Sequence, residues 1–223
     1  MAVILGTGEY RYEVVDHWAK LPPGMEFNAD VAAVGVDAQD RVYAFNRGAH
    51  PMCVFDRDGN FLRSWGEPGT DPGQFNIPHN ICCDAEGWVY VADRENHRIQ
   101  VFDTQGRYET QWNNMHRPSG LYLERGASAR FYVGEVGGGM AVNQDIHNIG
   151  PRVSIYSAKG ELLARLGNRP AGLEPGQFIS PHGLAVDSRG DIYVGEVSFT
   201  NWGRRGPIPP GLRSLQKLRR LGA

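Results

Sequence analysis

Two histidines in the sequence stand in nearly the same local context. His79 follows Gly-Gln-Phe-Asn-Ile-Pro, and His182 follows Gly-Gln-Phe-Ile-Ser-Pro. Neutral imidazole nitrogen is a common ligand of zinc and related divalent ions, so two histidines brought to one point would form part of a metal site. A closed zinc site needs three or four protein ligands, and this motif supplies two. The alternative is that both histidines are structural and donate hydrogen bonds to carbonyl groups in their turns.

Two arginines form a second candidate set. Arg47 and Arg94 follow Asn46 and Asp93 at the ends of apolar runs, and the same positions in two later units read Glu135-Val136 and Glu196-Val197, so three carboxylates belong to this set. Guanidinium groups bind carboxylates in a bidentate manner, and nearby carboxylates could handle protons, so this set could bind and transform an anionic substrate. Pairing of these arginines with carboxylates of neighbouring units would explain the same residues structurally. The sequence leaves both interpretations open.

These polar residues flank short apolar segments that recur four times along the chain. The second segment of each unit has a tyrosine at the same place, and Asp- or Gly-containing turns separate the segments. Runs of four or five residues rich in Val, Ile, Tyr and Phe between such turns predict β-strands. Four short antiparallel strands in every unit of roughly 40 to 60 residues are typical of propeller blades. The expected second, third and fourth strands are Val42–Ala44, Met52–Phe55, Phe61–Trp65, Val89–Val91, Ile99–Phe102, Tyr108–Trp112, Phe131–Val133, Val153–Tyr156, Leu162–Leu166 and Ile192–Val194.

We therefore predict an all-β propeller of four blades in a single domain, residues 1–223. The blades are expected at about 28–66, 72–113, 114–167 and 175–223. The last unit has a third strand at Leu215–Leu218 but no fourth, while Val14–Trp18 matches Phe61–Trp65 with tryptophan on tryptophan. We expect this N-terminal strand, within residues 10–19, to complete the last blade and to leave no exposed edge.

A ring of blades would bring one position of each unit to the central channel. These positions, just before each first strand, are Ala32, His79, Ser119 and His182. The two histidines then belong to alternate blades and face each other. The Gly-rich insertion Gly137–Pro151 and the segment Thr200–Leu212 interrupt the last two units, and such insertions usually surround the binding face of a repeat array.

Composition narrows the class of protein. The formal net charge is −2, which gives no electrostatic footprint for nucleic acid, and the basic cluster Arg213–Arg220 is explained as the solvated flank of a strand. There is no run of 18 apolar residues and no secretory signal pattern at the N-terminus. The three cysteines, Cys53, Cys82 and Cys83, fall inside expected strands and predict buried free thiols in a reducing compartment, hence a cytoplasmic protein.

The segment from Gly73 to Phe102 resembles an NHL repeat. The set Phe45-Asn46-Arg47-Gly48, Pro78-His79, Ala92-Asp93-Arg94-Glu95-Asn96 and Pro181-His182 further resembles the peptidyl-α-hydroxyglycine α-amidating lyases and their bacterial relatives. That resemblance implies a six-bladed NHL propeller with zinc on three Pro-His histidines, here matched by His79 and His182. It implies that Arg47 and Arg94 bind and cleave a hydroxyglycine substrate, releasing an amide and glyoxylate.

Departures from the lyase pattern keep other functions open. The chain has four units where the lyases have six, two Pro-His sites where they have three, no match to their Asp-Gly-Tyr motif, and Gly183 where they place an acidic calcium ligand. The main hypothesis is a metal-dependent lyase acting on a small anionic or α-hydroxyglycine-type substrate. A non-catalytic scaffold that binds a peptide or protein partner is the alternative, and a calcium-dependent lactonase-like propeller is a third. The sequence also leaves open whether four blades close alone or two chains combine as a homo-oligomer.

Overall fold

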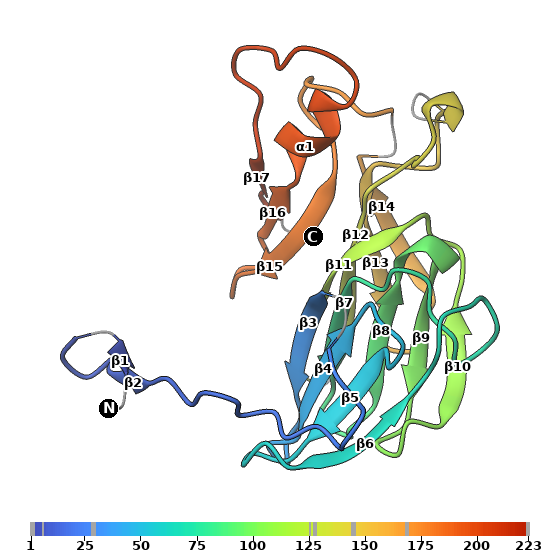
Figure 1. Ribbon diagram of the computed structural model, residues 1–223. Coiled ribbons are helices and arrows are strands. Elements are labelled where there is room, and N and C mark those ends of the chain that lie inside the picture. Colours follow the sequence, from blue (N-terminus) through green and yellow to red (C-terminus); the bar gives the residue numbers. More distant parts are fainter. Residues whose placement is uncertain are drawn as a thin grey trace.

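The protein is built almost entirely of antiparallel β-sheet, as the sequence predicts (Figure 1). The computed structural model describes residues 3–5, 7–27, 30–124, 126, 129–143, 146–167 and 170–221. Three four-stranded sheets and one three-stranded sheet follow one another along the chain and form the blades of a propeller. Helical structure among these residues is limited to short segments, η1 (Arg94–Asn96), η2 (Ala141–Asn143) and α1 (Ser198–Gly203). No helix in the described part of the chain is long and apolar enough to span a membrane.

Each sheet is a simple meander in which consecutive strands are neighbours. Sheet 1 contains β3 (Val31–Val36), β4 (Val42–Asn46), β5 (Met52–Phe55) and β6 (Phe61–Trp65). Sheet 2 contains β7 (Asn80–Cys83), β8 (Val89–Asp93), β9 (Arg98–Phe102) and β10 (Tyr108–Trp112). Sheet 3 contains β11 (Pro118–Leu123), β12 (Arg130–Glu135), β13 (Arg152–Ser157) and β14 (Leu162–Leu166). Sheet 4 contains β15 (Pro181–Val186), β16 (Ile192–Glu196) and β17 (Leu215–Leu218).

The turn between the third and fourth strands shows why these hairpins form. In sheet 1, Asp56 Oδ1 accepts hydrogen bonds from the backbone N–H groups of Asp58 and Asn60, and Gly59 has a left-handed φ of 80°. An Asp side chain that bonds to the backbone two residues on, followed by Gly at positive φ, favours a tight reversal. The same arrangement recurs at Asp103 in sheet 2, and it explains why these strand ends are predictable from sequence.

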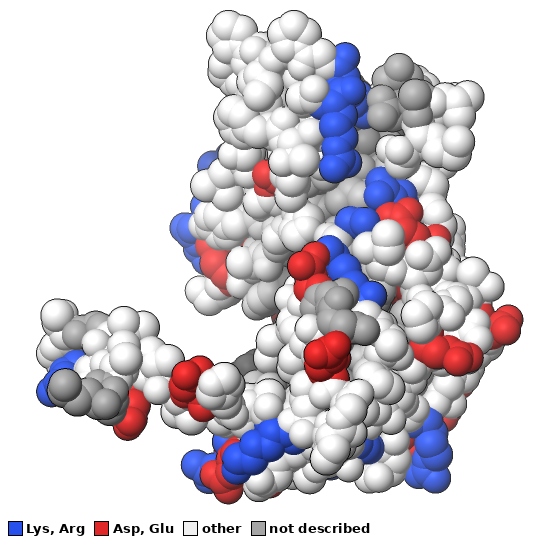
Figure 2. Space-filling model, viewed as in Figure 1, with Lys and Arg blue, Asp and Glu red and all other residues white. Residues whose placement is uncertain are grey.

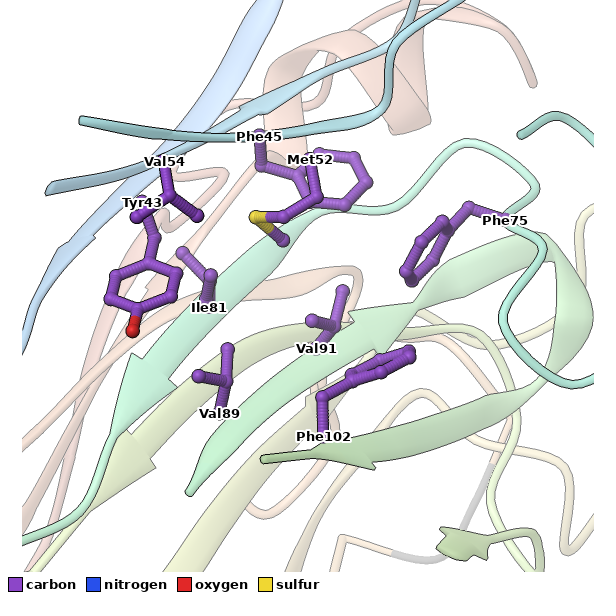
Figure 3. Close-up of a cluster of buried hydrophobic side chains, with 9 residues drawn as sticks. All are labelled: Tyr43, Phe45, Met52, Val54, Phe75, Ile81, Val89, Val91 and Phe102. Atoms are coloured by element: carbon purple, nitrogen blue, oxygen red, sulfur yellow. The ribbon is translucent and has the colours of Figure 1, made fainter. Parts of the chain in front are cut away.

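The hydrophobic core lies between successive sheets rather than within one sheet. Figure 3 shows the cluster between sheets 1 and 2, where Phe45 and Met52 of sheet 1 face Phe75, Val91 and the sheet 2 strand residue Phe102. Equivalent clusters fill the spaces between sheets 2 and 3 and between sheets 3 and 4. The first strands of successive sheets pack side by side, β3 on β7, β7 on β11 and β11 on β15. This packing fixes the sheets around a common centre.

The expectation that Val14–Trp18 completes the last sheet is wrong in this structure. Sheet 4 has three strands, and the only strands described before β3 are β1 (Ile4–Leu5) and β2 (Tyr12–Glu13), which pair with each other. Residues 3–5 and 7–17 project from the body of the molecule (Figure 1). Trp18 packs on Phe55 of sheet 1 instead, because sheet 4 lies against sheet 3, away from this end of the chain.

Candidate functional site

The two histidines predicted to face each other do meet. His79 ends the turn before β7 and His182 lies in β15, so they come from sheets 2 and 4. Their Nε2 atoms are 3.0 Å apart and their rings are edge to face, with centroids 4.9 Å apart. His79 is buried with 9% of its surface exposed. Burial, followed by the charge of Arg94, lowers the pKa of His79 to about 3, and burial also lowers the pKa of His182. Both imidazoles are therefore neutral at neutral pH.

Both candidate arginines reach the same histidine. Arg47 Nη2 lies 3.1 Å from His79 Nδ1, and Arg94 Nη1 lies 3.1 Å from His79 Nε2. Arg47 follows the end of β4, and Arg94 begins the 3₁₀ turn after β8, so the propeller topology places two corresponding loop residues of neighbouring sheets at one point. Arg47 also has a long contact of 3.4 Å to Asp30. The four residues singled out in the sequence thus form one cluster drawn from sheets 1, 2 and 4.

This cluster has more hydrogen-bond donors than acceptors. A neutral imidazole has a single lone-pair nitrogen, yet guanidinium groups face both ring nitrogens of His79. At least one guanidinium N–H group is therefore directed at a ring nitrogen that carries a hydrogen. An anion placed between these groups would accept hydrogen bonds from both arginines and relieve this mismatch. The arrangement therefore favours a carboxylate or similar anion.

The donor set matches part of a metal site. Two nitrogen ligands of a tetrahedral zinc ion lie roughly 3.3 Å apart, given Zn–N bonds of about 2.0–2.1 Å, close to the 3.0 Å between the histidine Nε2 atoms. No group of three or more His, Cys, Asp and Glu side chains with metal-binding geometry exists among the described residues. The two histidines therefore fit two ligand positions of a divalent ion, and the other ligands would have to come from a bound substrate or solvent.

The three carboxylates of the second candidate set do not join this cluster. Asp93 accepts from Arg98 Nε at 2.9 Å, and Glu135 pairs with Arg152 at 2.7 Å, both within their own sheets. Glu196 accepts from Gln216 and from backbone N–H groups of the turn before β15. All three are at least nine-tenths buried. The sequence left open whether these carboxylates act on a substrate or pair structurally with other residues. In the structure they pair structurally, within a sheet rather than between neighbouring sheets.

The sequence reasoning did not single out Glu95 and Arg117. Glu95 Oε1 accepts hydrogen bonds from Arg94 Nε and from Arg117 Nη2, each at 2.7 Å. Glu95 therefore holds Arg94 from one side while the Nη1 atom of Arg94 points at His79. The signal for Glu95 in the sequence was that it directly follows Arg94. The role of Arg117 depends on a contact between sheets 2 and 3 that local sequence does not reveal.

Space for a ligand lies beside Arg47. A hollow of about 460 Å³ is lined by Arg47 and Asn46 of sheet 1 and by the turn from Phe75 to Pro78 that leads to His79. On the face of the molecule shown in Figure 2, basic and acidic side chains are interspersed rather than separated. The excess of guanidinium groups around His79 is thus a local property of the site.

Comparison with known families identifies one repeat directly. Residues 75–102 match the NHL repeat. This NHL repeat contains His79 and Arg94, which places two of the four clustered residues inside it. No curated protein shows significant sequence similarity to the chain.

Solved structures confirm the β-propeller fold. Virginiamycin B lyase from Staphylococcus aureus matches with a TM-score of 0.52 at 15% identity, covering 76% of this chain and 50% of that chain. Hydrazine synthase from Kuenenia stuttgartiensis matches with a TM-score of 0.55 at 12% identity, covering 79% and 46%. A chain of a nidogen–laminin complex matches with a TM-score of 0.52 at 15% identity, covering 74% and 56%. The chain spans about half the length of these relatives.

Proposed function

We propose that the chain is an amidating-lyase-like NHL propeller that binds a small α-hydroxy acid or α-hydroxyglycine-type substrate at the His79–His182 cluster. The observation that carries this proposal is the meeting of two neutral histidines and two guanidinium groups from three sheets at 3.0 to 3.1 Å. The donor excess supports an anionic ligand, and a carboxylate is the anion whose two oxygens suit two guanidinium groups.

Each residue has a distinct part in this proposal. Arg47 and Arg94 bind the substrate carboxylate and orient the neighbouring carbon toward the histidines. Glu95 keeps Arg94 aimed at the site through its 2.7 Å ion pair. His79 and His182 would hold zinc or another divalent ion, which when bound would polarise the substrate hydroxyl and lower its pKa. The hydroxyl would then lose its proton, its C–O bond would become the C=O of glyoxylate as the C–N bond breaks, and the leaving nitrogen would take up a proton to give the amide. The step therefore balances without an oxidant.

Glyoxylate release tests this proposal. The protein, loaded with zinc, is incubated with an N-acyl-α-hydroxyglycine, and glyoxylate is measured. We expect turnover that falls at least tenfold in Arg94→Gln and Arg47→Gln, because each loses a charge-assisted hydrogen bond of about 1.5–3 kcal/mol. Arg107→Gln is the matched control, since the Arg107 side chain is 80% exposed in a pair with Asp103. Turnover that is absent, or equally reduced in all three variants, would refute the assignment.

A specific surface favours the scaffold alternative. Met140 and Val142 in the insertion Gly137–Pro151 are 68% and 80% exposed, and Ile146 is 51% exposed. Exposed apolar side chains grouped on one loop are typical of a protein-binding surface. If the chain is a scaffold, binding of a peptide partner should be lost in the double variant Met140→Asp, Val142→Asp and be unaffected by Arg94→Gln. The opposite pattern supports the lyase-like site.

A further inference from the structure

The position of Trp18 repeats a contact found between the complete sheets. Trp18 packs on Phe55, the last residue of β5, with ring centroids 5.6 Å apart. Its ring also lies against Gly59, where an added Cβ would be 3.2 Å from Trp18 Cδ2 and 1.9 Å from the Trp18 carbonyl oxygen. Trp18 Nε1 donates to the carbonyl oxygen of Arg57 in the same turn. One side chain thus spans the end of the third strand and the turn of sheet 1.

The tryptophans that end β6 and β10 make the same contact with the next sheet. Trp65 of sheet 1 packs on Phe102, the last residue of β9, at 5.8 Å and lies against the turn glycine of sheet 2, Gly106. Trp112 of sheet 2 packs near the end of β13 in sheet 3 at 6.1 Å and lies against the equivalent turn glycine. Trp18 therefore lies where the fourth-strand tryptophan of a sheet preceding sheet 1 would lie.

The rest of that preceding sheet is missing from the surface of sheet 1. Val34 and Val36 of β3 are 59% and 56% exposed, whereas Leu184 and Val186, at the same register positions of β15, pack into the cluster between sheets 3 and 4. Residues 18–27 cover only the half of this face formed by the outer strands. An apolar stripe along the inner strand is left open.

Sheet 4 leaves its other face and its outer edge uncovered. In the described part of the chain it has no fourth strand, so no strand described there pairs with the outer edge of β17. Leu215 is 69% exposed, whereas Met52, at the equivalent position of sheet 1, is fully buried against sheet 2. Wherever two consecutive sheets pack in this protein, the face of one that corresponds to the free face of sheet 4 packs on the face of the next that corresponds to the open stripe of sheet 1.

The two surfaces do not meet within one chain. Sheet 4 is held on sheet 3 by an apolar cluster that includes Val194 and Phe178, and His182 is held at His79. Among the described elements, β15 packs on β11 and β12 but not extensively on β3. Bringing sheet 4 onto sheet 1 of the same chain would expose that cluster to water.

We propose that a second copy of this chain docks its sheet 4 on sheet 1, where Val14–Trp18 becomes the missing fourth strand. Gln216 indicates the register, because its Nε2 donates to Gln177 O as Gln100 Nε2 of sheet 2 donates to Gln74 O. By analogy with the β9–β10 pairing, Trp18 then lies opposite Leu215 of the other copy, and Asp16 lies opposite Lys217.

Charge supports this pairing. The segment 9–16 contains Glu9, Glu13 and Asp16 against one arginine, whereas residues 217–220 contain one lysine and two arginines. The contact is heterologous, with different surfaces of the two copies, so it generates a closed ring or a longer assembly. The inference is independent of the proposed function, since the two docking surfaces contain no residue of the His79 cluster and need no ligand there.

Disulfide trapping between copies tests the register. Asp16→Cys and Lys217→Cys are made in separate chains, mixed and mildly oxidised; these side chains are 85% and 41% exposed in the free chain. Burial raises the pKa of Cys53 to about 11 and that of Cys83 to about 12, so these native thiols react slowly. We expect the mixed disulfide in at least tenfold excess over the control pair Asp16→Cys and Glu86→Cys. No excess would overturn the proposal.

The solution mass provides the second measurement. Light scattering should show a multiple of the chain mass that Leu215→Asp reduces to the monomer, whereas Leu163→Asp on sheet 3 leaves the mass unchanged; Leu163 is 53% exposed. Because both leucines are exposed, neither change should unfold the chain. A monomer at every concentration overturns the proposal. An intrachain disulfide in the double variant Asp16→Cys, Lys217→Cys at low protein concentration also overturns the proposal, because it would show that sheet 4 closes on sheet 1 of the same chain.

Discussion

The buried Asp93–Arg98 pair predicts a large and specific loss of stability. Asp93 accepts from the backbone N–H of Asn76, from the Asn96 amide, from Arg98 and from Gln100, and its side chain is fully buried. The Arg98 side chain is 5% exposed. Asp93→Asn keeps the shape but leaves the guanidinium charge buried without a counter-charge, which costs about 3–5 kcal/mol. That is a large part of the roughly 5–15 kcal/mol typical of a folded domain.

A matched exposed pair provides the control. Asp103 and Arg107 form an ion pair of similar length, 2.7 Å, but the Arg107 side chain is 80% exposed. Asp103→Asn should therefore cost about 0–1 kcal/mol from the ion pair, plus the turn hydrogen bonds it weakens. Urea unfolding followed by tryptophan fluorescence measures both variants. Equal losses in the two variants would refute the reasoning that burial, rather than pairing itself, determines the cost.

Two further predictions concern pH and packing. Burial, followed by the charge of His97, lowers the pKa of His116 to about 4. Between pH 6.5 and 4 this histidine is protonated in the unfolded chain but neutral in the folded chain. The free energy of unfolding should therefore fall by up to about 3 kcal/mol as the pH is lowered from 6.5 to 4. His116→Gln should flatten that part of the stability curve, and an unchanged slope would contradict the stated cause. Gly106→Ala should destabilise more than Gly73→Ala by about 1–3 kcal/mol: both have left-handed φ, but only at Gly106 would the new Cβ meet a side chain, Trp65 at 2.5 Å. Equal thermal shifts in the two variants would argue against this contact.

Much of the fold could be predicted because local chemistry determines it. The strands Met52–Phe55, Phe61–Trp65 and Leu215–Leu218 have the predicted bounds, since β-rich runs end at turns whose Asp and Gly residues have few alternatives. The all-β propeller with four blades is confirmed for the same reason, because repeated units of this kind have few ways to bury both faces.

The N-terminal strand could not be placed from the sequence. The tryptophan match to Phe61–Trp65 predicts a fourth strand, but Val14–Trp18 forms no strand in this structure, and a sequence match does not specify which sheet a segment packs on. In this structure Trp18 lies on sheet 1 while sheet 4 stays with sheet 3. The energy of packing sheet 4 on one neighbour or another depends on the angle between blades, and local sequence contains no measure of that angle.

The site could be predicted in part. The repeat correspondence placed His79, His182, Arg47 and Arg94 near one another, because equivalent positions of blades converge. It could not show that Asp93, Glu135 and Glu196 turn inward to bond within their own sheets, since the same carboxylate spacing suits either arrangement. Glu95 was hidden for a related reason, as its two arginine partners come from different sheets.

Binding of a carboxylate ligand at the histidine cluster tests the central claim most directly. Isothermal titration of an N-acyl-α-hydroxyglycine into the zinc-loaded protein should show saturable binding. Affinity should fall about 10- to 150-fold in Arg94→Gln, the equivalent of the 1.5–3 kcal/mol of one charge-assisted hydrogen bond, and stay unchanged in Arg107→Gln. Unaltered affinity in Arg94→Gln, or no saturable binding to the native chain, would contradict the account.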